Sequence, residues 1–183
     1  MKAFLISLIV VSVVSITSFA GSLVPSVGLN AGWVFPISNL SDTLNGSYQI
    51  GIFVRANSII IPYTDLVLDV GYTSLPGKSS SDVSMLFIPI SLSGEFAPLP
   101  DFGILPYLKL GGGIVLENYK NGSSNTTNTD PFFLVGLGGR QKISDKITLK
   151  IEGTYNYIYQ KYISGSAYDG TYINICAGIL YQF

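Results

Sequence analysis

The side chains that could do chemistry in this chain are charged residues that recur at alternate positions within apolar segments. Lys150 and Glu152 are two residues apart, and Arg140 lies in the segment before them. Alternate residues of an extended strand share one face, so these charges would gather on one side of a sheet. They could pair with one another as a plug or line a narrow ion path. The full set is Arg55, Asp69, Glu95, Lys109, Glu117, Arg140, Lys150 and Glu152.

Catalytic and metal chemistry is poorly supported by the composition. The chain has no histidine and one cysteine, Cys176. It therefore lacks the usual general base near neutral pH, the usual zinc ligands and an internal disulfide. The run Gly111-Gly112-Gly113 lacks the Lys-Ser/Thr pair and helix of a phosphate loop, which favours close backbone packing inside a strand. We expect no enzymatic activity, no cofactor and no metal site.

Strands are the elements that must position the charges. Residues 173–183 alternate between apolar and polar or small side chains and end on an aromatic. Seven earlier segments alternate in the same way and are separated by turns, which is typical of an antiparallel membrane barrel. The eight predicted strands cover 26–35, 47–55, 66–72, 86–95, 104–117, 133–142, 147–159 and 173–183.

The predicted connections alternate in kind. Four are polar, and those at 97–103 and 144–146 are short or rich in proline. The connection at 56–64 contains three consecutive isoleucines, which blur its boundaries. Long loops at one end and short turns at the other fit an up-and-down barrel with both termini on the turn side. The four polar connections cover 38–46, 74–82, 120–130 and 160–170.

The composition and the first twenty residues indicate an exported membrane protein. Charged residues make up 11% of the chain, against about 25% in a typical soluble domain. No apolar stretch after residue 20 is long enough for a spanning helix, and lipid otherwise admits only closed barrels. A basic start, an apolar run and small residues up to Ala20 form the pattern of a signal peptide. We predict a cleaved signal peptide at 1–20 and one barrel domain at 21–183. The net charge of −1 and the lack of a basic stripe argue against a nucleic-acid partner.

The face that meets lipid decides between a membrane barrel and a soluble barrel of lipocalin type. Glycines gather among the charged residues, where a narrow interior needs small side chains beside long ones, and the opposite face consists of Ile, Leu, Val and Tyr. Aromatics on the apolar face near the loop-side strand ends fit a membrane girdle. They are Trp33, Phe35, Tyr72, Tyr155, Tyr157 and Tyr159. We predict an all-β, eight-stranded antiparallel up-and-down transmembrane β-barrel.

The C-terminal strand carries one further motif. Gly178, Tyr181 and Phe183 match the ending Gly-x-x-aromatic-x-aromatic, and Cys176 stands where a polar residue is usual. In this motif and in its alternation over the mature chain, the sequence resembles the small eight-stranded outer-membrane β-barrel family of OmpA and OmpX type. The resemblance implies a multi-pass barrel in the bacterial outer membrane. It also implies contact with outer-membrane lipids and recognition of the last strand by the barrel-assembly machinery during biogenesis.

Two classes of function remain open. One is a non-enzymatic structural or surface-recognition role through the polar extracellular loops, for a partner that the sequence does not identify. The other is a narrow passive channel or transporter for ions or small apolar molecules. The inward-facing Phe53, Phe87, Phe132 and Leu134 could form an apolar pocket for such a molecule or pack beneath the charge layer. Eight strands leave little lumen, which favours the plug and the first class.

Overall fold

The computed structural model describes residues 25–57, 61–78, 83–98, 103–159 and 169–183. The predicted signal peptide at 1–20 lies outside these residues and stays a prediction. Among the residues described, no helix is long and apolar enough to cross a bilayer.

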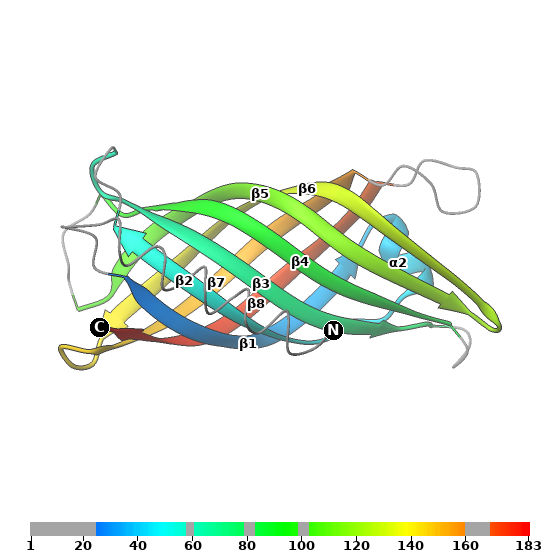
Figure 1. Cartoon of the computed structure of the whole chain (residues 1–183), viewed down its shortest axis with the longest axis horizontal. Coiled ribbons are helices and arrows are strands. Elements are labelled where there is room, and N and C mark those ends of the chain that lie inside the picture. The colour runs from blue at the N-terminus through cyan, green and yellow to red at the C-terminus, as the bar shows by residue number, and fades with distance from the viewer. Residues whose placement is uncertain (1–24, 58–60, 79–82, 99–102, 160–168) are drawn as a thin grey trace.

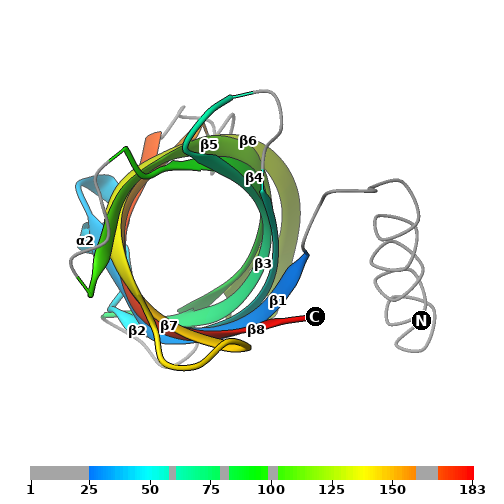
Figure 2. The ribbon, with the colours of Figure 1, turned by 90° about the vertical axis from the view of Figure 1, so that its left-hand side faces the viewer.

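The described residues form one closed barrel of eight antiparallel strands (Figures 1 and 2). Each strand pairs with the next in sequence, and the last strand pairs with the first from Ser26 opposite Gln182 to Ile37 opposite Thr171. The predicted up-and-down architecture is therefore confirmed. The strands are β1 (Ser26–Ile37), β2 (Ser47–Asn57), β3 (Thr64–Pro76), β4 (Val83–Phe96), β5 (Leu105–Asn121), β6 (Ser124–Lys142), β7 (Ile147–Tyr159) and β8 (Asp169–Gln182).

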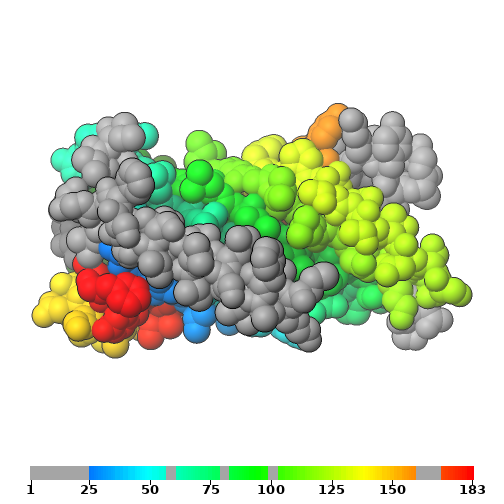
Figure 3. Space-filling view, viewed as in Figure 1, coloured from blue at the N-terminus to red at the C-terminus, as the bar shows by residue number. Residues whose placement is uncertain are grey.

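The barrel has two unlike ends. The terminal end holds the start of β1, the end of β8 and the predicted tight turn at 144–146 (Figure 1). There the backbone N–H of Gln182 donates a hydrogen bond to the backbone carbonyl of Lys146, at 2.9 Å. The hairpin end holds the short helix α2 (Asn39–Thr43) and the tip of the β5–β6 hairpin, which projects furthest from the barrel (Figures 1 and 3).

Alternation along each strand gives the wall an apolar outer face and a polar inner face. On β7, Lys150, Glu152 and Thr154 are buried, whereas Ile151 and Tyr155 are exposed. A soluble barrel would show the reverse, because burial of apolar surface drives folding in water. The aliphatic side chains that are 60% to 69% exposed are Leu29, Leu108, Leu110, Leu137 and Ile151.

The predicted polar loop at 120–130 is wrong. β5 runs to Asn121 and β6 begins at Ser124, so only two residues separate them. Gly122 makes this turn possible, because its φ of 57° is a left-handed conformation that favours glycine. Polar residues continue the strands here because cross-strand pairs stabilise a ladder, as the Asn118 side-chain amide does by donating to the Thr127 hydroxyl at 3.1 Å.

Two other predicted connections are too long. β3 continues to Pro76, three residues into the connection predicted at 74–82. β8 begins at Asp169, inside the loop predicted at 160–170, and residues 160–168 lie outside the described part of the chain. Both errors come from assigning polar residues to loops where backbone pairing with a neighbouring strand continues.

Helix α2 lies within the polar run at 38–46 and was not predicted. Leu40 and Leu44 are four residues apart, so they lie on one face of a helical turn, and both are buried. Backbone bonds from Asn45 to Pro76 and from Lys78 to Thr43 tie this segment to the end of β3. The two leucines complete a cluster that we call the apolar plug: Val34, Leu40, Leu44, Leu75, Met85, Phe87, Val115, Phe132, Leu134, Ile158 and Tyr172.

Candidate functional site

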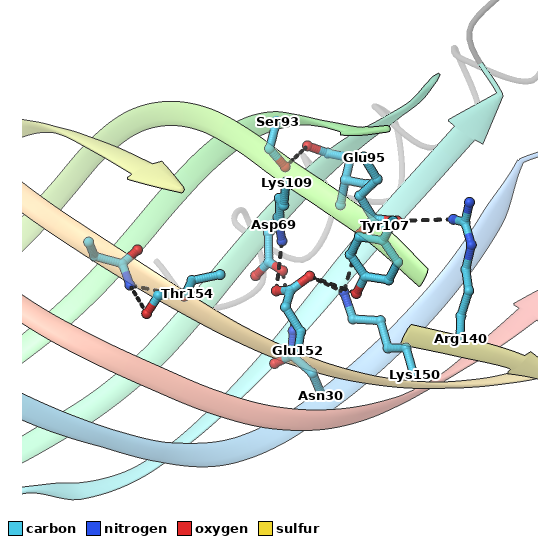
Figure 4. A network of polar contacts seen from close by, with 12 residues as sticks. Asn30, Asp69, Ser93, Glu95, Tyr107, Lys109, Arg140, Lys150, Glu152 and Thr154 are labelled. Atoms are coloured by element: carbon cyan, nitrogen blue, oxygen red, sulfur yellow. Dashed lines mark hydrogen bonds and ion pairs between the residues drawn. The ribbon is translucent and has the colours of Figure 1, made fainter. Parts of the chain in front are cut away.

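One carboxylate organises the polar interior near the terminal end (Figure 4). Glu152 accepts from Lys109 at 2.9 Å on Oε1, from Lys150 at 3.3 Å on Oε2 and from the Tyr107 hydroxyl at 2.9 Å on Oε2. The side chains of Glu152 and both lysines are at most 3% exposed. Each charge therefore has a partner in a place where an unpaired charge would be very unfavourable.

Further ion pairs extend this arrangement across the lumen. Arg140 lies 3.0 Å from Glu95 and 2.6 Å from Asp65, and Lys150 lies 3.6 Å from Glu95. Lys150 thus joins the Glu95 and Glu152 groups into one set, which we call the ion-pair network. Its members are Arg55, Asp65, Glu95, Tyr107, Lys109, Arg140, Lys150 and Glu152.

Small residues make room for the network's long side chains. A Cβ on Gly138 would overlap the ring of Tyr107, and a Cβ on Gly178 would lie 3.3 Å from Cγ of Lys150. The predicted reason for interior glycines therefore holds at these two positions. Glycine here serves close approach, as expected where a barrel interior is just wide enough for its side chains.

The eight predicted charges lie inside the barrel but do not form one group. Glu117 is buried opposite Phe87 and Asn128, toward the hairpin end. Asp69 accepts from the Asn30 side-chain amide at 3.2 Å and faces the middle of the lumen. The other six belong to the ion-pair network: Arg55, Glu95, Lys109, Arg140, Lys150 and Glu152.

The prediction that Arg140 pairs with the neighbouring charges Lys150 and Glu152 is wrong, because Arg140 has other partners. Arg140 lies directly opposite Lys150 on neighbouring strands, and two cations in that register repel each other. Its guanidinium instead reaches Glu95 and Asp65 across the barrel. The sign of the charge, rather than the position on the neighbouring strand, therefore determines which residues Arg140 pairs with.

Sequence reasoning missed three members of the polar interior. Asp65 was assigned to a strand boundary, although it has the same parity as Asp69 and so faces inward. Tyr107 shares the strand parity of Lys109, and its hydroxyl donates to Glu152, which is 45 residues away in sequence. Asn30 also faces inward, and its side-chain amide donates to Asp69. The alternation of inward and outward positions along the strand could have identified Asp65 as an interior residue. No local feature of the sequence identifies the partners across the lumen.

Side chains of the described residues occupy both halves of the lumen. The ion-pair network occupies the terminal half, and the apolar plug closes the hairpin half. Between them lies a cavity of about 30 Å³, bordered by Lys109 and Glu152 on one side and by Phe132, Leu134 and Tyr172 on the other. That volume has room for about one water molecule. Among the described residues, no group of three or more His, Cys, Asp or Glu side chains could hold a metal ion.

The four inward apolar residues do not all pack beneath the charges, as one prediction had it. Phe87, Phe132 and Leu134 belong to the apolar plug toward the hairpin end. Phe53 packs with Val67 and Leu180 in a separate cluster, where the Lys150 ammonium lies 4.2 Å from its ring centre. They fill the interior rather than form a shared pocket.

Aromatic side chains occur on the outer wall toward both ends of the barrel. Of the predicted girdle, Tyr157 is half-buried against Phe133, with ring centres 5.1 Å apart, and the others are exposed: Trp33, Phe35, Tyr72, Tyr155 and Tyr159. A second set at the terminal end was not assigned to the girdle. It consists of Tyr63, Phe96, Tyr181 and Phe183, all exposed. Two such belts match the two interfaces of a bilayer.

The residues of the predicted assembly motif lie at the end of β8. Tyr181 and Phe183 expose their rings, which meet edge to face with centres 5.3 Å apart. Lys146 places its ammonium 5.9 Å from the Tyr181 ring centre. Gly178 lies opposite Asn30 and Lys150 on the neighbouring strands. The two aromatic rings of the motif are thus accessible on the outer face, Gly178 faces the interior, and recognition of the motif stays a prediction.

Comparison with known proteins decides the family. The family model described as outer membrane protein beta-barrel domain matches residues 6–183. The chain belongs to this family. It is therefore an integral β-barrel of the bacterial outer membrane, with the apolar outer face in lipid and the polar face toward the lumen.

Solved structures share the fold of this outer-membrane barrel. Neisserial surface protein A is 18% identical with a TM-score of 0.66, and the match covers 87% of this chain and 97% of that one. A major outer membrane protein from Thermus thermophilus is 12% identical with a TM-score of 0.59, covering 88% and 100%. OprG from Pseudomonas aeruginosa is 11% identical with a TM-score of 0.55, covering 87% and 96%. No curated protein sequence matches the chain.

Trp33 offers a direct check of the lipid-facing wall, because it is the single tryptophan of the chain and is 47% exposed. In vesicles, we expect lipids with brominated acyl chains to quench its fluorescence more strongly than aqueous acrylamide does. Urea-unfolded protein is the control, and there the order should reverse. Strong acrylamide quenching without quenching by brominated lipid would place the apolar face in water.

Proposed function

We propose that this outer-membrane barrel is a non-enzymatic protein with a structural or surface-recognition role at its hairpin end. The observation that carries the proposal is the occupied lumen of the described residues, in which a cavity of about 30 Å³ lies between the ion-pair network and the apolar plug. An interior with room for about one water offers no passage to a solute. The function of the protein then depends on its surfaces outside the lipid.

The hairpin end supplies such a surface. The β5–β6 hairpin continues past the pair Phe132–Ile158, which among the described residues is the last pair between β6 and β7. Residues 120–127 are exposed, and apart from Lys120 they are uncharged polar residues and one glycine. Amide and hydroxyl groups held rigidly on paired strands suit hydrogen bonding to an external partner, because little conformational entropy is lost on binding. We assign this end to the cell exterior, with both termini on the periplasmic side.

A narrow conduit is the alternative that this arrangement disfavours. An ion path would require several buried ion pairs to separate together, and a path for an apolar molecule would require α2 and the plug to move apart. Leu40 and Leu44 are both buried in that plug. A closed interior therefore supports recognition over transport.

Two partners follow from the outer wall and the C-terminus. We propose outer-membrane lipids as the solvent of the exposed aliphatic wall between the two aromatic belts. We also propose that the barrel-assembly machinery recognises Gly178, Tyr181 and Phe183 during biogenesis. Tyr181 and Phe183 present their rings at the terminal end, where an exposed edge-to-face pair is available to a partner protein.

Shortening the hairpin tests the recognition role. Glu117 and Asn128 pair directly, so a two-residue Asn-Gly turn can replace residues 118–127 without changing the register. We expect the shortened barrel to keep its heat-modifiable gel mobility, because only the outermost four pairs of β4 with β5 are lost and most of the apolar plug is unchanged. Proteoliposomes carrying it should lose whatever binding the wild type shows on glycan and extracellular-matrix protein arrays.

The matched control changes the opposite end. Asp145→Asn with Lys146→Gln alters the exposed turn at 144–146 and leaves the hairpin intact, so its binding should equal that of the wild type. Equal binding by the shortened barrel would contradict recognition through the hairpin. Binding lost equally in the control would assign it to the terminal end instead.

A further inference from the structure

The middle of the lumen contains a polar layer between the ion-pair network and the apolar plug. Its side chains border the cavity of about 30 Å³ and are each more than nine-tenths buried. We call these residues the polar layer: Asn30, Gln49, Ser91, Thr154, Asn156 and Asn174. Buried amide and hydroxyl groups require hydrogen-bond partners. A group of this layer that has no partner in the protein therefore requires one from a ligand in the cavity.

Two side-chain carbonyls of the polar layer lack a partner among the described residues. They are Oδ1 of Asn30, which is 6% exposed, and Oδ1 of Asn174, which is 7% exposed. Turning the Asn30 amide over would not help, because its Nδ2 donates to Asp69 at 3.2 Å and the exchange would set oxygen against a carboxylate. These two carbonyls therefore lack hydrogen-bond donors.

Two glycines of the wall accommodate amides of the polar layer. Gly51 and Gly71 lie opposite each other on β2 and β3. A Cβ on Gly51 would come within 2.5 Å of Oδ1 of Asn30, and a Cβ on Gly71 would come within 2.9 Å of Nε2 of Gln49. The missing side chains at this glycine pair thus let the Asn30 carbonyl and the Gln49 amide lie close against the wall.

Charge and volume decide the class of ligand. On the network side of the cavity, the cations Arg55, Lys109, Arg140 and Lys150 balance the anions Asp65, Asp69, Glu95 and Glu152, since 4 − 4 = 0, and Glu117 and Asp130 are buried further toward the hairpin end. The network side therefore has no excess negative charge to attract a metal cation. A cavity of about 30 Å³ has room for about one water.

We infer that the polar layer is a binding site for ordered internal water, which donates to the side-chain carbonyls of Asn30 and Asn174. This water completes the hydrogen bonding of a layer that is closed by ion pairs on one side and by apolar side chains on the other. The inference concerns the closed barrel and does not depend on what the hairpin end recognises.

Cross-relaxation between water and the side-chain amides tests the inference. In full-length mature protein refolded in micelles, the NH₂ groups of Asn30 and Asn174 should show water cross-peaks with the sign of a bound water that stays longer than nanoseconds. Asn174→Leu is nearly isosteric and removes the second amide. The cross-peak at Asn30 should then be the only one of the two that remains, at equal or lower intensity. Asn118→Leu, on the exposed hairpin, should leave both cross-peaks unchanged. Absent cross-peaks in the wild type would overturn the inference.

Two further readouts keep the test decisive if the spectra are crowded. If water satisfies Asn174, then Asn174→Leu should lower the thermal midpoint, because a hydrogen-bonded site is lost. A dry, unsatisfied carbonyl would give no change or a higher midpoint, since an apolar isostere would remove its penalty. Replacing sodium by choline should leave the Asn174 resonances in place, and a sodium-dependent shift would assign the site to a cation instead.

Discussion

Replacing Glu152 by leucine is expected to destabilise the barrel by about 3–5 kcal/mol, the usual cost of breaking a buried ion pair by removing one partner. Glu152 accepts three hydrogen bonds, so its loss leaves Lys109, Lys150 and Tyr107 without that acceptor in the lumen. Equilibrium urea unfolding in lipid vesicles, followed by Trp33 fluorescence, measures the change in the free energy of unfolding.

Two companion variants separate charge from shape. Glu152→Gln keeps the side-chain volume and a carbonyl acceptor, so it should fall between the wild type and Glu152→Leu. Asp145→Asn removes a fully exposed carboxylate from its ion pair with Lys142, where solvent screens the charge, and should leave the unfolding midpoint unchanged. If Glu152→Leu unfolded at the wild-type midpoint, the ion-pair network would not hold the interior together.

A second large effect is expected at Gly113, in the middle of β5. A Cβ there would overlap the carbonyl oxygen of Ile90, which belongs to the paired backbone of β4 and cannot turn aside as a flexible side chain would. Gly113→Ala should therefore cost at least the upper part of the roughly 1–3 kcal/mol typical of overpacking, or abolish folding. The fraction of protein with heat-modifiable mobility after refolding measures this loss.

Gly153→Ala is the matched control for that variant. Gly153 lies within β7, and a Cβ there meets nothing within 4 Å. It makes the same chemical change in a strand without a steric clash, so its refolded fraction should equal that of the wild type. Equal refolding of both variants would show that the backbones of β4 and β5 can move apart enough to accept a methyl group at residue 113, and would contradict this prediction.

The parts of the fold that follow a period of two were predictable. Alternation from Ile147 to Tyr159 set both faces of β7, and the close packing expected at Gly111-Gly112-Gly113 is confirmed by the clash that Gly113→Ala would create. The polar extension of β5 and β6 was missed because Thr, Asn and Ser carry no apolar alternation. There the strand persists through cross-strand pairing, which a single segment does not reveal.

The interior was only half predictable, for a related reason. Parity tells which way a side chain points, so the inward charges could be found from the sequence. The choice of partner depends on which strands face each other across the lumen and on the sign of each charge. Arg140 and Asp65 are 75 residues apart in the numbering, and their pairing depends on closure of the whole barrel. Helix α2 escaped notice because one helical turn is too short for a periodic signal.

The central claim is that the interior is closed, and electrical recording tests it most directly. Purified full-length mature protein, reconstituted into planar bilayers, should show no stable conductance above that of the bare membrane, because the ion-pair network and the apolar plug fill the lumen. Heat-modifiable mobility of the same sample would establish that the barrel is folded. A reproducible open channel from that folded sample would contradict the account and favour a conduit.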